Sequence, residues 1–552
     1  MRTRFEAAVV AVVVCVALYA SSVVRTLAPG GFNDDAVYLA LGRAIANGDG
    51  YRSIYLVGSP LHVKFPPGLP AILAVLWKLG GSLKTVHTLA VGLNVVACSL
   101  AAAGLWWFAR SRVQLSPLLT APLVIVPFLL DPAAQYYTLV LSEPLFILMW
   151  VGALLFSDRI TRANGDTPAL GTAVALGLTL GAAALIRAQG IVLIAAVVLA
   201  LLLARTPRRL WLTTGAAAAL PLAVWRMYLA VQPADSLATQ ASEQGYLTFA
   251  GGLGSTLSAI LTAAPTNLRD YAIMLADYLS PIRSVGVAAV VACTLLTVAG
   301  IVRLARNGHR ALAFTVVANG LALVLWPTYQ DRLVFPLLPF AGIAAAFALG
   351  GIVSAAARRF SLDGIRAELV SLPVACVGLF VLSRQATIRH SGETARANGD
   401  AAAVASPSQW LPSNSGFVMS VAQWTLSSTQ PNDRVALASA AGLWLYTGRK
   451  TVLTEFVEAH GVASAFDVPG RYLASRLVAD SVNVVVVESG YSPIARDIVT
   501  VRAKCPSALT IIPGFPGQQF PAFLRATPGD ACVRALDESL RNASPRHVTT
   551  AG

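Results

Sequence analysis

Two adjacent carboxylates, Asp34 and Asp35, follow the first long apolar segment of the chain. Carboxylates at the edge of apolar sequence are costly unless they cap a helix, bind a cation or take part in a reaction. In the structural interpretation, Asn33 or Asp34 caps a helix over residues 36–47, because acidic residues favour the first turn of a helix. In the chemical interpretation, an ionised carboxylate accepts a proton from a substrate hydroxyl group. The sequence leaves both interpretations open.

A second segment of interest is HVKFPPGLP at residues 62–70. Proline is common at the start of a helix, so this segment predicts a loop-to-helix junction. The ammonium group of Lys64 either reaches the membrane surface along its aliphatic stem or binds an anion. Glu143 precedes Pro144 as a helix-start carboxylate would. Arg187 is either an anchor at the end of a span or a ligand for an anion.

Metal and phosphate-loop chemistry receive no support from the sequence. His62, His87 and His309 are scattered without the spacing of metal ligands, and structural or surface positions are expected for them. The glycine-rich stretch at 251–254 follows no strand, so we expect a mobile loop there and not a phosphate-binding loop.

The composition indicates which elements must position these residues. The chain has 552 residues, of which 56% are hydrophobic and 12% charged, whereas a soluble domain has ~25% charged residues. The apolar residues come in segments of about twenty, the length that crosses roughly 30 Å of hydrocarbon. Only helices satisfy their own backbone hydrogen bonds in lipid. The sequence therefore predicts a polytopic α-helical membrane protein.

The positive charges indicate the orientation in the membrane. A net charge of +14 would suggest nucleic acid in a soluble protein, but the arginines lie at the ends of apolar segments, so we expect no nucleic-acid partner. The arginines form five clusters: Arg110 and Arg112; Arg159 and Arg162; Arg205, Arg208 and Arg209; Arg303, Arg306 and Arg310; and Arg358, Arg359 and Arg366. Each cluster is separated from the next by enough apolar sequence for two membrane crossings, so all five can be cytoplasmic.

This alternation predicts about eleven transmembrane helices. They lie near 5–27, 86–109, 115–141, 144–157, 168–186, 190–204, 210–230, 284–302, 310–326, 333–356 and 368–384. Arg2 and Arg4 keep the N-terminus in the cytoplasm, and the odd number of spans places the C-terminus outside. The outer segments are then a large first loop (28–85), the turns at Glu143 and Arg187, a loop at 231–283, the turn at 326–332 and everything after about 386. The apolar stretch at 68–79 is short for a span and predicts an interfacial helix.

The chain becomes polar after about residue 385. Short apolar runs predict strands at 434–439, 483–488 and 509–512, and helical patterns lie between them at 440–446 and 471–479. This alternation predicts a transmembrane domain at 1–385, an extracytoplasmic α/β domain at 386–540 and a disordered tail at 541–552. Cys505 and Cys532 lie in the polar part and are expected to pair if it faces an oxidising compartment.

Several short motifs together resemble a known family. Asp34-Asp35-x-x-Tyr38 after the first span, followed by Lys64-Phe65-Pro66-Pro67, is similar to the first outer loop of the GT-C membrane glycosyltransferases. The similarity is to the branch that contains the protein O-mannosyltransferases and the lipid A aminoarabinose transferase. Leu141-Ser142-Glu143-Pro144 resembles the acidic T-E-P turn of that branch, and residues 331–339 resemble its R-Y-x-x-P-x-x-P element. The likeness covers about residues 1–350, and a C-terminal outer domain is typical of the bacterial members.

The resemblance implies a membrane glycosyltransferase. Such an enzyme moves a sugar from a polyprenyl-phosphate donor to a hydroxyl group of an envelope glycolipid, glycan or protein, with inversion. The reaction takes place at the outer face of a bacterial-type cytoplasmic membrane. The lipid-linked sugar is a substrate, so no cofactor is expected. Since the chain has no Asp-x-Asp arrangement, we expect metal-independent catalysis.

The resemblance also implies roles for single residues. Asp34 would be the general base, and Asp35 would orient it or tune its pKa. Lys64 matches the lysine near the donor phosphate, Arg332 matches the last motif, and Arg187 is placed beside them only by the predicted topology. The predicted substrate pocket consists of Tyr38, Glu143 and His62.

One position departs from the family pattern. The relatives that act on lipid A have a basic residue just before the tyrosine, where this chain has Val37, so a different phosphate clamp or donor is expected.

Two other classes of function stay open. A transporter or flippase would need polar or broken helices at the membrane midplane, whereas this chain keeps its spans nearly free of charge, with Asp131 as the main exception. A non-catalytic scaffold would use the outer domain to bind a partner.

Overall fold

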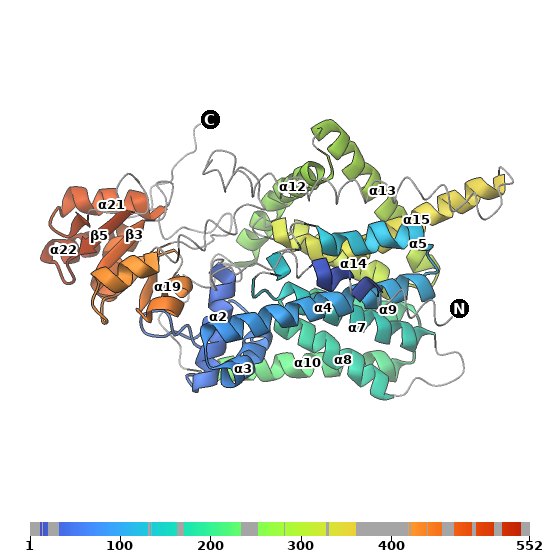
Figure 1. Ribbon diagram of the computed structural model, residues 1–552, viewed down its shortest axis with the longest axis horizontal. Helices are drawn as coiled ribbons and strands as arrows, with labels where there is room; N and C mark the ends of the chain where they lie inside the picture. Colours follow the sequence, from blue (N-terminus) through green and yellow to red (C-terminus); the bar gives the residue numbers. More distant parts are fainter. Residues whose placement is uncertain are drawn as a thin grey trace.

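The computed structural model describes most of the chain except several connecting segments and both ends. The described residues are 11–13, 15–19, 33–130, 133, 135–137, 139–162, 170–232, 252–280, 282–326, 331–359, 418, 421–438, 440–454, 468–487, 493–512 and 522–541. They form a helical bundle with a smaller α/β unit at one end (Figure 1).

Helices make up nearly all of the bundle. They are α2 (Asn33–Asn47), α3 (Gly68–Gly80), α4 (Leu83–Ser111), α5 (Pro117–Thr120), α7 (Glu143–Thr161), α8 (Leu170–Ile186), α9 (Gly190–Leu203), α10 (Arg208–Ala230), α12 (Gly252–Leu279), α13 (Arg283–Arg306), α14 (Arg310–Val324) and α15 (Leu338–Arg359). The 29 residues of α4 contain no proline, and the Ser82 hydroxyl caps the helix by accepting from the Thr85 amide at 3.2 Å. α4 is therefore about 43 Å long, enough to cross the hydrocarbon layer.

The lengths and apolar character of these helices show a membrane protein. Within the described part of the chain, four helical segments are long and apolar enough to cross a membrane: Leu83–Ser111, Glu143–Thr161, Arg283–Arg306 and Phe335–Ala356. Five shorter apolar helices accompany them at Gly68–Gly80, Pro117–Leu129, Leu170–Ile186, Gly190–Leu203 and Arg310–Val324. The total of eleven spans stays a prediction. The predicted span at 368–384 lies outside the described residues, and that at 5–27 is described only at 11–13 and 15–19, which are helical.

Two predicted segments differ from the structure. The outer loop predicted at 231–283 contains the 28-residue helix α12, so residues 252–254 of the glycine-rich stretch begin a helix and not a mobile loop. The continuous span predicted at 115–141 is broken. After α5 the backbone passes through the π-helical η1 (Ala121–Ile125) and the 3₁₀-helical η2 (Val126–Leu129), each with a proline in its first turn. Proline lacks an amide donor, so it interrupts the regular ladder of an α-helix.

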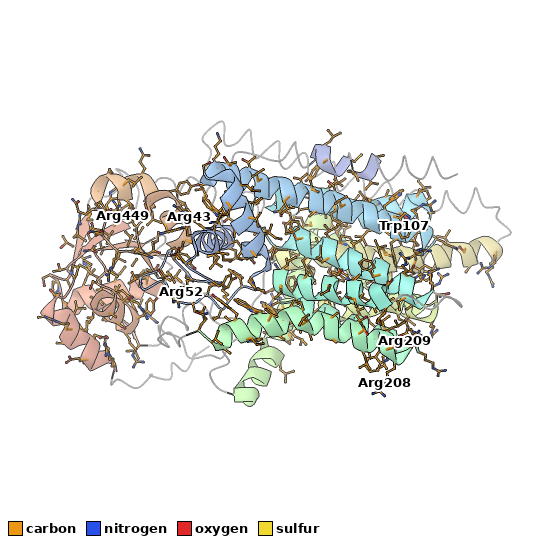
Figure 2. The ribbon with its side chains drawn as sticks, turned by 90° about the horizontal axis from the view of Figure 1, so that it is seen from below. Arg43, Arg52, Trp107, Arg208, Arg209 and Arg449 are labelled. Atoms are coloured by element: carbon orange, nitrogen blue, oxygen red, sulfur yellow. A yellow bond between two sulfur atoms is a disulfide. The ribbon has the colours of Figure 1, made fainter. Side chains whose placement is uncertain are left out.

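The arginine-rich helix ends gather at one end of the bundle. Asp158 near the end of α7 pairs with Arg112 at 3.0 Å and with Arg162 at 2.7 Å. Arg310 at the start of α14 donates to the Leu203 carbonyl at the end of α9 at 2.8 Å. Figure 2 shows Arg208 and Arg209 at the end of the bundle opposite the α/β unit. This placement is the one expected if all clusters lie on a single side of the membrane, while the compartment on that side stays a prediction.

The α/β unit is built on a five-stranded mixed sheet of order β2-β1-β3-β5-β4. Its strands are β1 (Val435–Leu437), β2 (Thr451–Leu453), β3 (Val484–Val487), β4 (Leu509–Ile512) and β5 (Ala522–Ala526), and its helices are α19 (Ala440–Thr447), α20 (Arg471–Ala479), α21 (Pro493–Lys504) and α22 (Ala531–Arg541). β1 is parallel to β2 and β3, whereas β5 is antiparallel to β3 and β4. Every residue of β3 is buried, as expected for a central strand. β2, β5, α21 and α22 were absent from the sequence prediction.

The loop between α2 and α3, predicted to be part of the first outer loop, joins the α/β unit to the bundle. The Thr451 amide donates to the Tyr55 carbonyl at 2.8 Å, and the Val57 amide donates to the Thr451 carbonyl at 3.1 Å. The loop thus covers the edge strand β2, whose backbone groups would otherwise be unpaired. A disulfide between Cys505 and Cys532, with a Cα–Cα distance of 5.7 Å, links the end of α21 to the start of α22. The predicted tail after 541 lies outside the described residues.

Candidate active site

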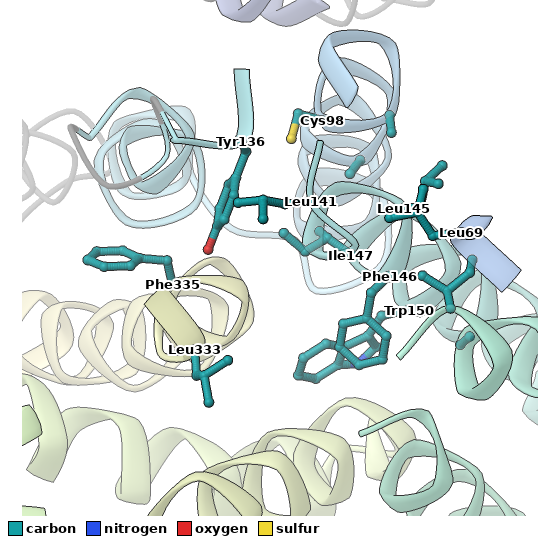
Figure 3. Close-up of a cluster of buried hydrophobic side chains, with 14 of the residues drawn as sticks. Leu69, Cys98, Tyr136, Leu141, Leu145, Phe146, Ile147, Trp150, Leu333 and Phe335 are labelled. Atoms are coloured by element: carbon teal, nitrogen blue, oxygen red, sulfur yellow. The ribbon is translucent and has the colours of Figure 1, made fainter. Parts of the chain in front are cut away.

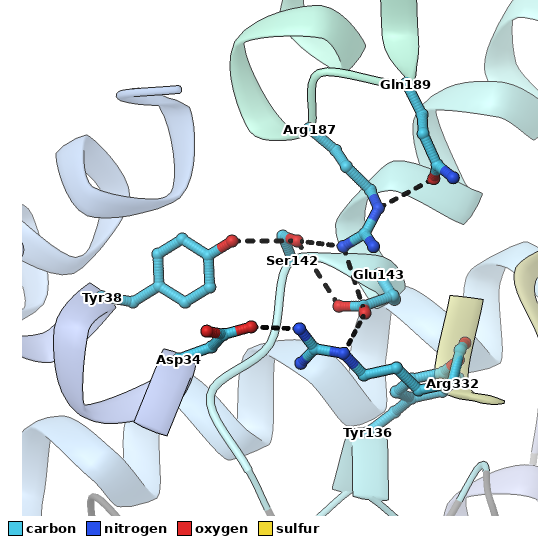
Figure 4. Close-up of polar contacts among 8 residues, drawn as sticks. All are labelled: Asp34, Tyr38, Tyr136, Ser142, Glu143, Arg187, Gln189 and Arg332. Atoms are coloured by element: carbon cyan, nitrogen blue, oxygen red, sulfur yellow. Dashed lines mark hydrogen bonds and ion pairs between the residues drawn. The ribbon is translucent and has the colours of Figure 1, made fainter. Parts of the chain in front are cut away.

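Two acids and two arginines form a largely buried ion-pair network (Figure 4). One of the acids lies on α2, which packs against α19 of the α/β unit. Arg332 pairs through Nη2 with Oδ2 of Asp34, in the first turn of α2. Its Nε lies 3.7 Å from Oε1 of Glu143, the first residue of α7. Arg187, in the turn between α8 and α9, places Nη1 at 3.1 Å from the same Glu143 oxygen. Glu143 is completely buried, and these arginines compensate its charge.

Neutral groups fix the orientation of Arg187 and Tyr38. Arg187 donates through Nη1 to the Ser142 hydroxyl at 2.8 Å and through Nε to Oε1 of Gln189 at 2.9 Å. The Tyr38 hydroxyl also donates to Ser142, at 3.4 Å. Tyr38 lies one helical turn beyond Asp34, so both side chains leave the same face of α2. Figure 4 shows Tyr38 and Asp34 pointing toward the two arginines.

Apolar packing holds the chain segments that carry these groups. Arg332 lies in η4 (Asp331–Leu333), and the neighbouring Leu333 and Phe335 are buried. The Tyr136 hydroxyl donates to the Arg332 carbonyl at 2.9 Å. Below them the rings of Trp150 and Phe340 stack at 3.8 Å between α7 and α15. Figure 3 shows Leu333, Phe335, Phe146 and Trp150 converging in one apolar cluster, so the site stands on a packed core.

A pocket opens over the network. Asp34, Lys64, Arg187 and Arg332 all line it, so the structure brings the two sequence motifs of the first loop to one place. The other lining residues come from α2, the segment around Lys64, the turn after α8 and residues 326–333. They are Tyr38, Phe65, Pro66, Ala188, Gln189, Trp326 and Leu333. Three cations, Lys64, Arg187 and Arg332, face two carboxylates, Asp34 and Glu143, in and beside the pocket, an excess of one positive charge. This arrangement favours an anionic ligand.

The electrostatics of Asp34 result from opposing effects. Burial raises the pKa of its carboxyl group, but the charges of Arg332, Lys64 and Arg187, with the Arg332 hydrogen bond, lower that pKa to below the ordinary value. Asp34 is therefore ionised at neutral pH. Burial and the charge of Asp34 raise the pKa of the Tyr38 hydroxyl, so this group stays protonated and can act as a hydrogen-bond donor.

His62 lies behind the pocket and does not line it. It is buried, and its ring stacks on Phe65 at 5.5 Å. The Phe65 amide donates to Nε2 at 3.1 Å, and Nδ1 lies 3.1 Å from the Ser53 hydroxyl. The Lys64 ammonium group in turn lies 5.0 Å from the centre of the Phe65 ring. His62 therefore supports the segment that presents Lys64, instead of bounding the substrate pocket itself as the resemblance implied.

Asp35 points away from the pocket. It is completely buried, and its charge acts on Tyr446 in α19, whose pKa is raised by burial and by Asp35. The largest charge effects on Asp34 come instead from Arg332 and Lys64. Adjacent residues of a helix face different directions, which explains why the second acid meets the α/β unit while the first meets the pocket.

The described residues contain no group of three His, Cys, Asp or Glu side chains that could hold a metal ion. The pocket residues that sequence reasoning missed are Gln189 and Trp326, together with Ser142 beneath them. Gln189 and Ser142 adjoin Arg187 and Glu143, so position next to a candidate charge was the available signal.

No family model and no curated protein sequence matches the chain. Solved structures do match. One is ArnT from Cupriavidus metallidurans bound to undecaprenyl phosphate, with a TM-score of 0.52 and 14% identity over 95% of this chain and 98% of the other. Another is the archaeal oligosaccharyltransferase AglB from Archaeoglobus fulgidus, in complex with an inhibitory peptide and a dolichol-phosphate. Its TM-score is 0.50, with 12% identity over 87% of this chain and 69% of the other.

The chain has the GT-C fold. The resemblance found in the short motifs is thus confirmed at the level of the fold. Within this GT-C fold, the predicted general base and the predicted phosphate ligands surround one pocket.

Proposed function

We propose that this protein is a membrane glycosyltransferase that moves a sugar from a polyprenyl-phosphate donor to a hydroxyl group of a cell-envelope glycolipid, glycan or protein. The observation that carries the proposal is the placement of an ionised aspartate, Asp34, in one pocket with Lys64, Arg187 and Arg332. A carboxylate and several cations at one end of a membrane bundle are what transfer from a lipid phosphate requires. The two similar solved structures both contain a polyprenyl phosphate.

In the proposed reaction, Asp34 accepts the proton of the acceptor hydroxyl as its oxygen attacks the anomeric carbon of the sugar. The bond from that carbon to the phosphate oxygen breaks, and its electron pair stays on the phosphate. Attack from the face opposite the leaving group inverts the configuration. Lys64, Arg187 and Arg332 stabilise the negative charge on the departing phosphate. The step needs no redox group and no cofactor, and we propose that it proceeds without a metal ion.

Through the ion pair between Arg332 and Asp34, the donor phosphate also changes the pKa of Asp34. Arg332 is shared by Asp34 and Glu143. A phosphate that attracts the guanidinium group weakens its pairing with Asp34. The pKa of Asp34 then rises, because burial, which favours the neutral acid, is less well opposed. Asp34 thereby becomes a stronger base when the donor is bound.

The proposed location is the outer face of a bacterial-type cytoplasmic membrane. The pocket lies at the bundle end opposite the arginine-rich helix ends, which the positive-inside rule assigns to the cytoplasm. The α/β unit is then extracytoplasmic, where its disulfide is stable.

The function is tested by comparing the envelopes of cells with and without the protein. Mass spectrometry of extracted glycolipids, glycans and glycoproteins should reveal one species that lacks a hexose or pentose in the deletion strain. Re-expression of the intact chain should restore the sugar, whereas Asp34→Asn should not. Identical envelope components in both strains would contradict the proposal.

A further inference from the structure

A second polar pocket lies where the first outer loop meets the α/β unit. It is separate from the candidate active site and shares none of its lining residues. The residues that matter for its chemistry come from the end of α2, from the loop after it and from the segment around α19. They are Arg43, Asp49, Arg52, Ser59, Trp444 and Lys450. Figure 2 shows Arg43 and Arg52 near this junction.

The pocket is positively charged. Three of its lining side chains, Arg43, Arg52 and Lys450, are cationic and one, Asp49, is acidic, which leaves an excess of two positive charges. The Lys450 ammonium group donates to the Ile54 carbonyl at 2.6 Å and to the Ser59 hydroxyl at 2.8 Å. These contacts use two of its three N–H groups, so the third can reach a ligand. Such a cluster fits a phosphate or carboxylate group.

One aromatic residue, Trp444, lines the pocket and is largely buried. The Arg43 guanidinium group lies 5.4 Å from the Trp77 ring and 5.2 Å from the Trp444 ring, within the range of cation–π contacts. These contacts fix the cation before any ligand arrives. Asn47 and Asp49 add exposed hydrogen-bonding groups at the rim. Amide and carboxylate groups beside the cations suit the hydroxyls of a sugar.

Backbone pairing makes the pocket rigid. The loop that carries Arg52 and Ser59 is joined to β2 through Tyr55 and Val57, and both bonds are made with Thr451, next to Lys450. The Arg52 guanidinium group donates to the Ser59 carbonyl at 3.2 Å and closes the loop. The cations of the bundle and that of the α/β unit are therefore held in one arrangement, which lowers the ordering cost of binding.

We infer that this pocket binds an anionic sugar, one that carries a phosphate or carboxylate group. On the proposed function, this sugar is part of the acceptor. Asp34 and Asn47 occupy opposite ends of α2, about 20 Å apart along the helix axis. An acceptor that spans several sugar units can fill the pocket with its charged unit while its hydroxyl reaches Asp34. The α/β unit thus contributes to acceptor selection through Trp444 and Lys450.

The test measures binding of glucose 6-phosphate to the full chain in phosphatidylcholine nanodiscs by calorimetry. Glucose and inorganic phosphate serve as separate probes of the sugar and the anion. Glucose 6-phosphate should bind at least about tenfold more tightly than either. The double variant Arg52→Gln with Lys450→Gln should weaken that binding at least about tenfold, corresponding to ~1.4 kcal/mol, while Arg52→Lys with Lys450→Arg should retain most of it.

A matched variant distinguishes binding at this pocket from binding at the candidate active site. Lys64→Met removes a cation of the candidate active site and should leave the affinity for glucose 6-phosphate unchanged. Equal binding by the wild type and the double Gln variant, or no binding at millimolar concentration, would overturn the inference, as would inorganic phosphate that binds as tightly as the sugar phosphate. The double Gln variant must keep the wild-type unfolding temperature, and if it does not, each single Gln variant replaces it. Because no sugar transfer is measured, failure here is distinct from failure of the proposed function.

Discussion

Arg332 contacts both acids of the candidate site, Asp34 through Nη2 and Glu143 through Nε. An aspartate with a lowered pKa is ionised over a wide pH range but is a weak base. On the proposed function, sharing one guanidinium group between two acids resolves this conflict. If Arg332 shifts toward a donor phosphate, Glu143 still has the charge of Arg187 beside it. At the residue scale, burial raises the pKa of Asp34, and Arg332 is the first of the cations that lower it.

The substitution Arg332→Gln should shift the acid limb of the pH–rate profile to higher pH. The base form of Asp34 exists above its pKa, so activity falls as the pH falls through that pKa. Loss of the cation leaves burial to raise the pKa, and we expect a shift of about 1 to 3 pH units. The measurement is kcat/KM against pH. Arg159→Gln, an exposed arginine in the last turn of α7, is the control and should leave the limb in place.

Lys64→Met should weaken donor binding. A charged hydrogen bond to a phosphate contributes roughly 1.5–3 kcal/mol, so the KM for the lipid-linked donor should rise about 10- to 100-fold. Lys64→Arg keeps the positive charge and should recover part of the loss. A KM for Lys64→Met within about twofold of the wild-type value would show that Lys64 does not contact the donor.

Single residues were predictable only where charge marked them. Asp34, Lys64 and Arg332 stood out as ions beside apolar sequence, and they line one pocket. The direction of Asp35 was not predicted, because the α19 surface that it meets lies over 400 residues later in the sequence. Trp326 gave no signal, because an aromatic residue at the end of a span is typical of any membrane protein.

At the scale of elements, close backbone approach between α3 and α8 sets the position of Lys64. Gly68 begins α3, and a Cβ atom there would lie 2.6 Å from the Leu185 carbonyl oxygen near the end of α8. Only glycine lets the KFPP segment approach the turn that carries Arg187. The helix start and the helix end thus form two sides of the pocket.

Gly68→Ala should therefore separate these two helices and lower both stability and activity. Overpacking of a tight contact costs typically 1–3 kcal/mol, which should appear as a lower unfolding temperature of the purified protein. Gly92→Ala in α4 is the matched control, because a Cβ atom there meets no atom within 4 Å. That control should be neutral or slightly stabilising, since alanine is the better helix former. Equal behaviour of the two variants would refute the contact.

Elements with strong apolar patterns were predictable, and those formed by distant pairing were not. β1 and β3 lie within the predicted runs at 434–439 and 483–488 because both are continuous buried apolar segments. β5 was not predicted, because the exposed Arg525 interrupts its run of apolar residues and because the strand forms by antiparallel pairing with β3 and β4. α12 escaped notice because Pro265 and several polar residues make its sequence resemble a loop.

At the scale of the whole molecule, the arginine-rich helix ends and the candidate site occupy opposite ends of the bundle. The sequence predicted this arrangement from charge alone, since the positive-inside rule depends on the positions of basic residues and not on tertiary contacts. It did not predict that the first outer loop would pair with the edge of β2, because that contact joins residues almost 400 positions apart.

Cysteine labelling tests the orientation. In a background whose free cysteines are replaced by alanine, Ser428→Cys in the α/β unit and Ser111→Cys at the end of α4 are both exposed positions. A membrane-impermeant maleimide should label Ser428→Cys in intact cells and Ser111→Cys only after permeabilisation. The reverse pattern would place the pocket in the cytoplasm and would contradict the proposed outer-face reaction.

The role of Asp34 as the base is tested by the rate of sugar transfer by Asp34→Asn. The rate is measured on the envelope product that the mass comparison identifies and is normalised to folded protein in the membrane. Loss of a general base lowers a rate by about 10²- to 10⁴-fold, and we expect a fall in this range with an unchanged unfolding temperature. A rate within about threefold of the wild type, far short of that range, would contradict the assignment of Asp34 as the base.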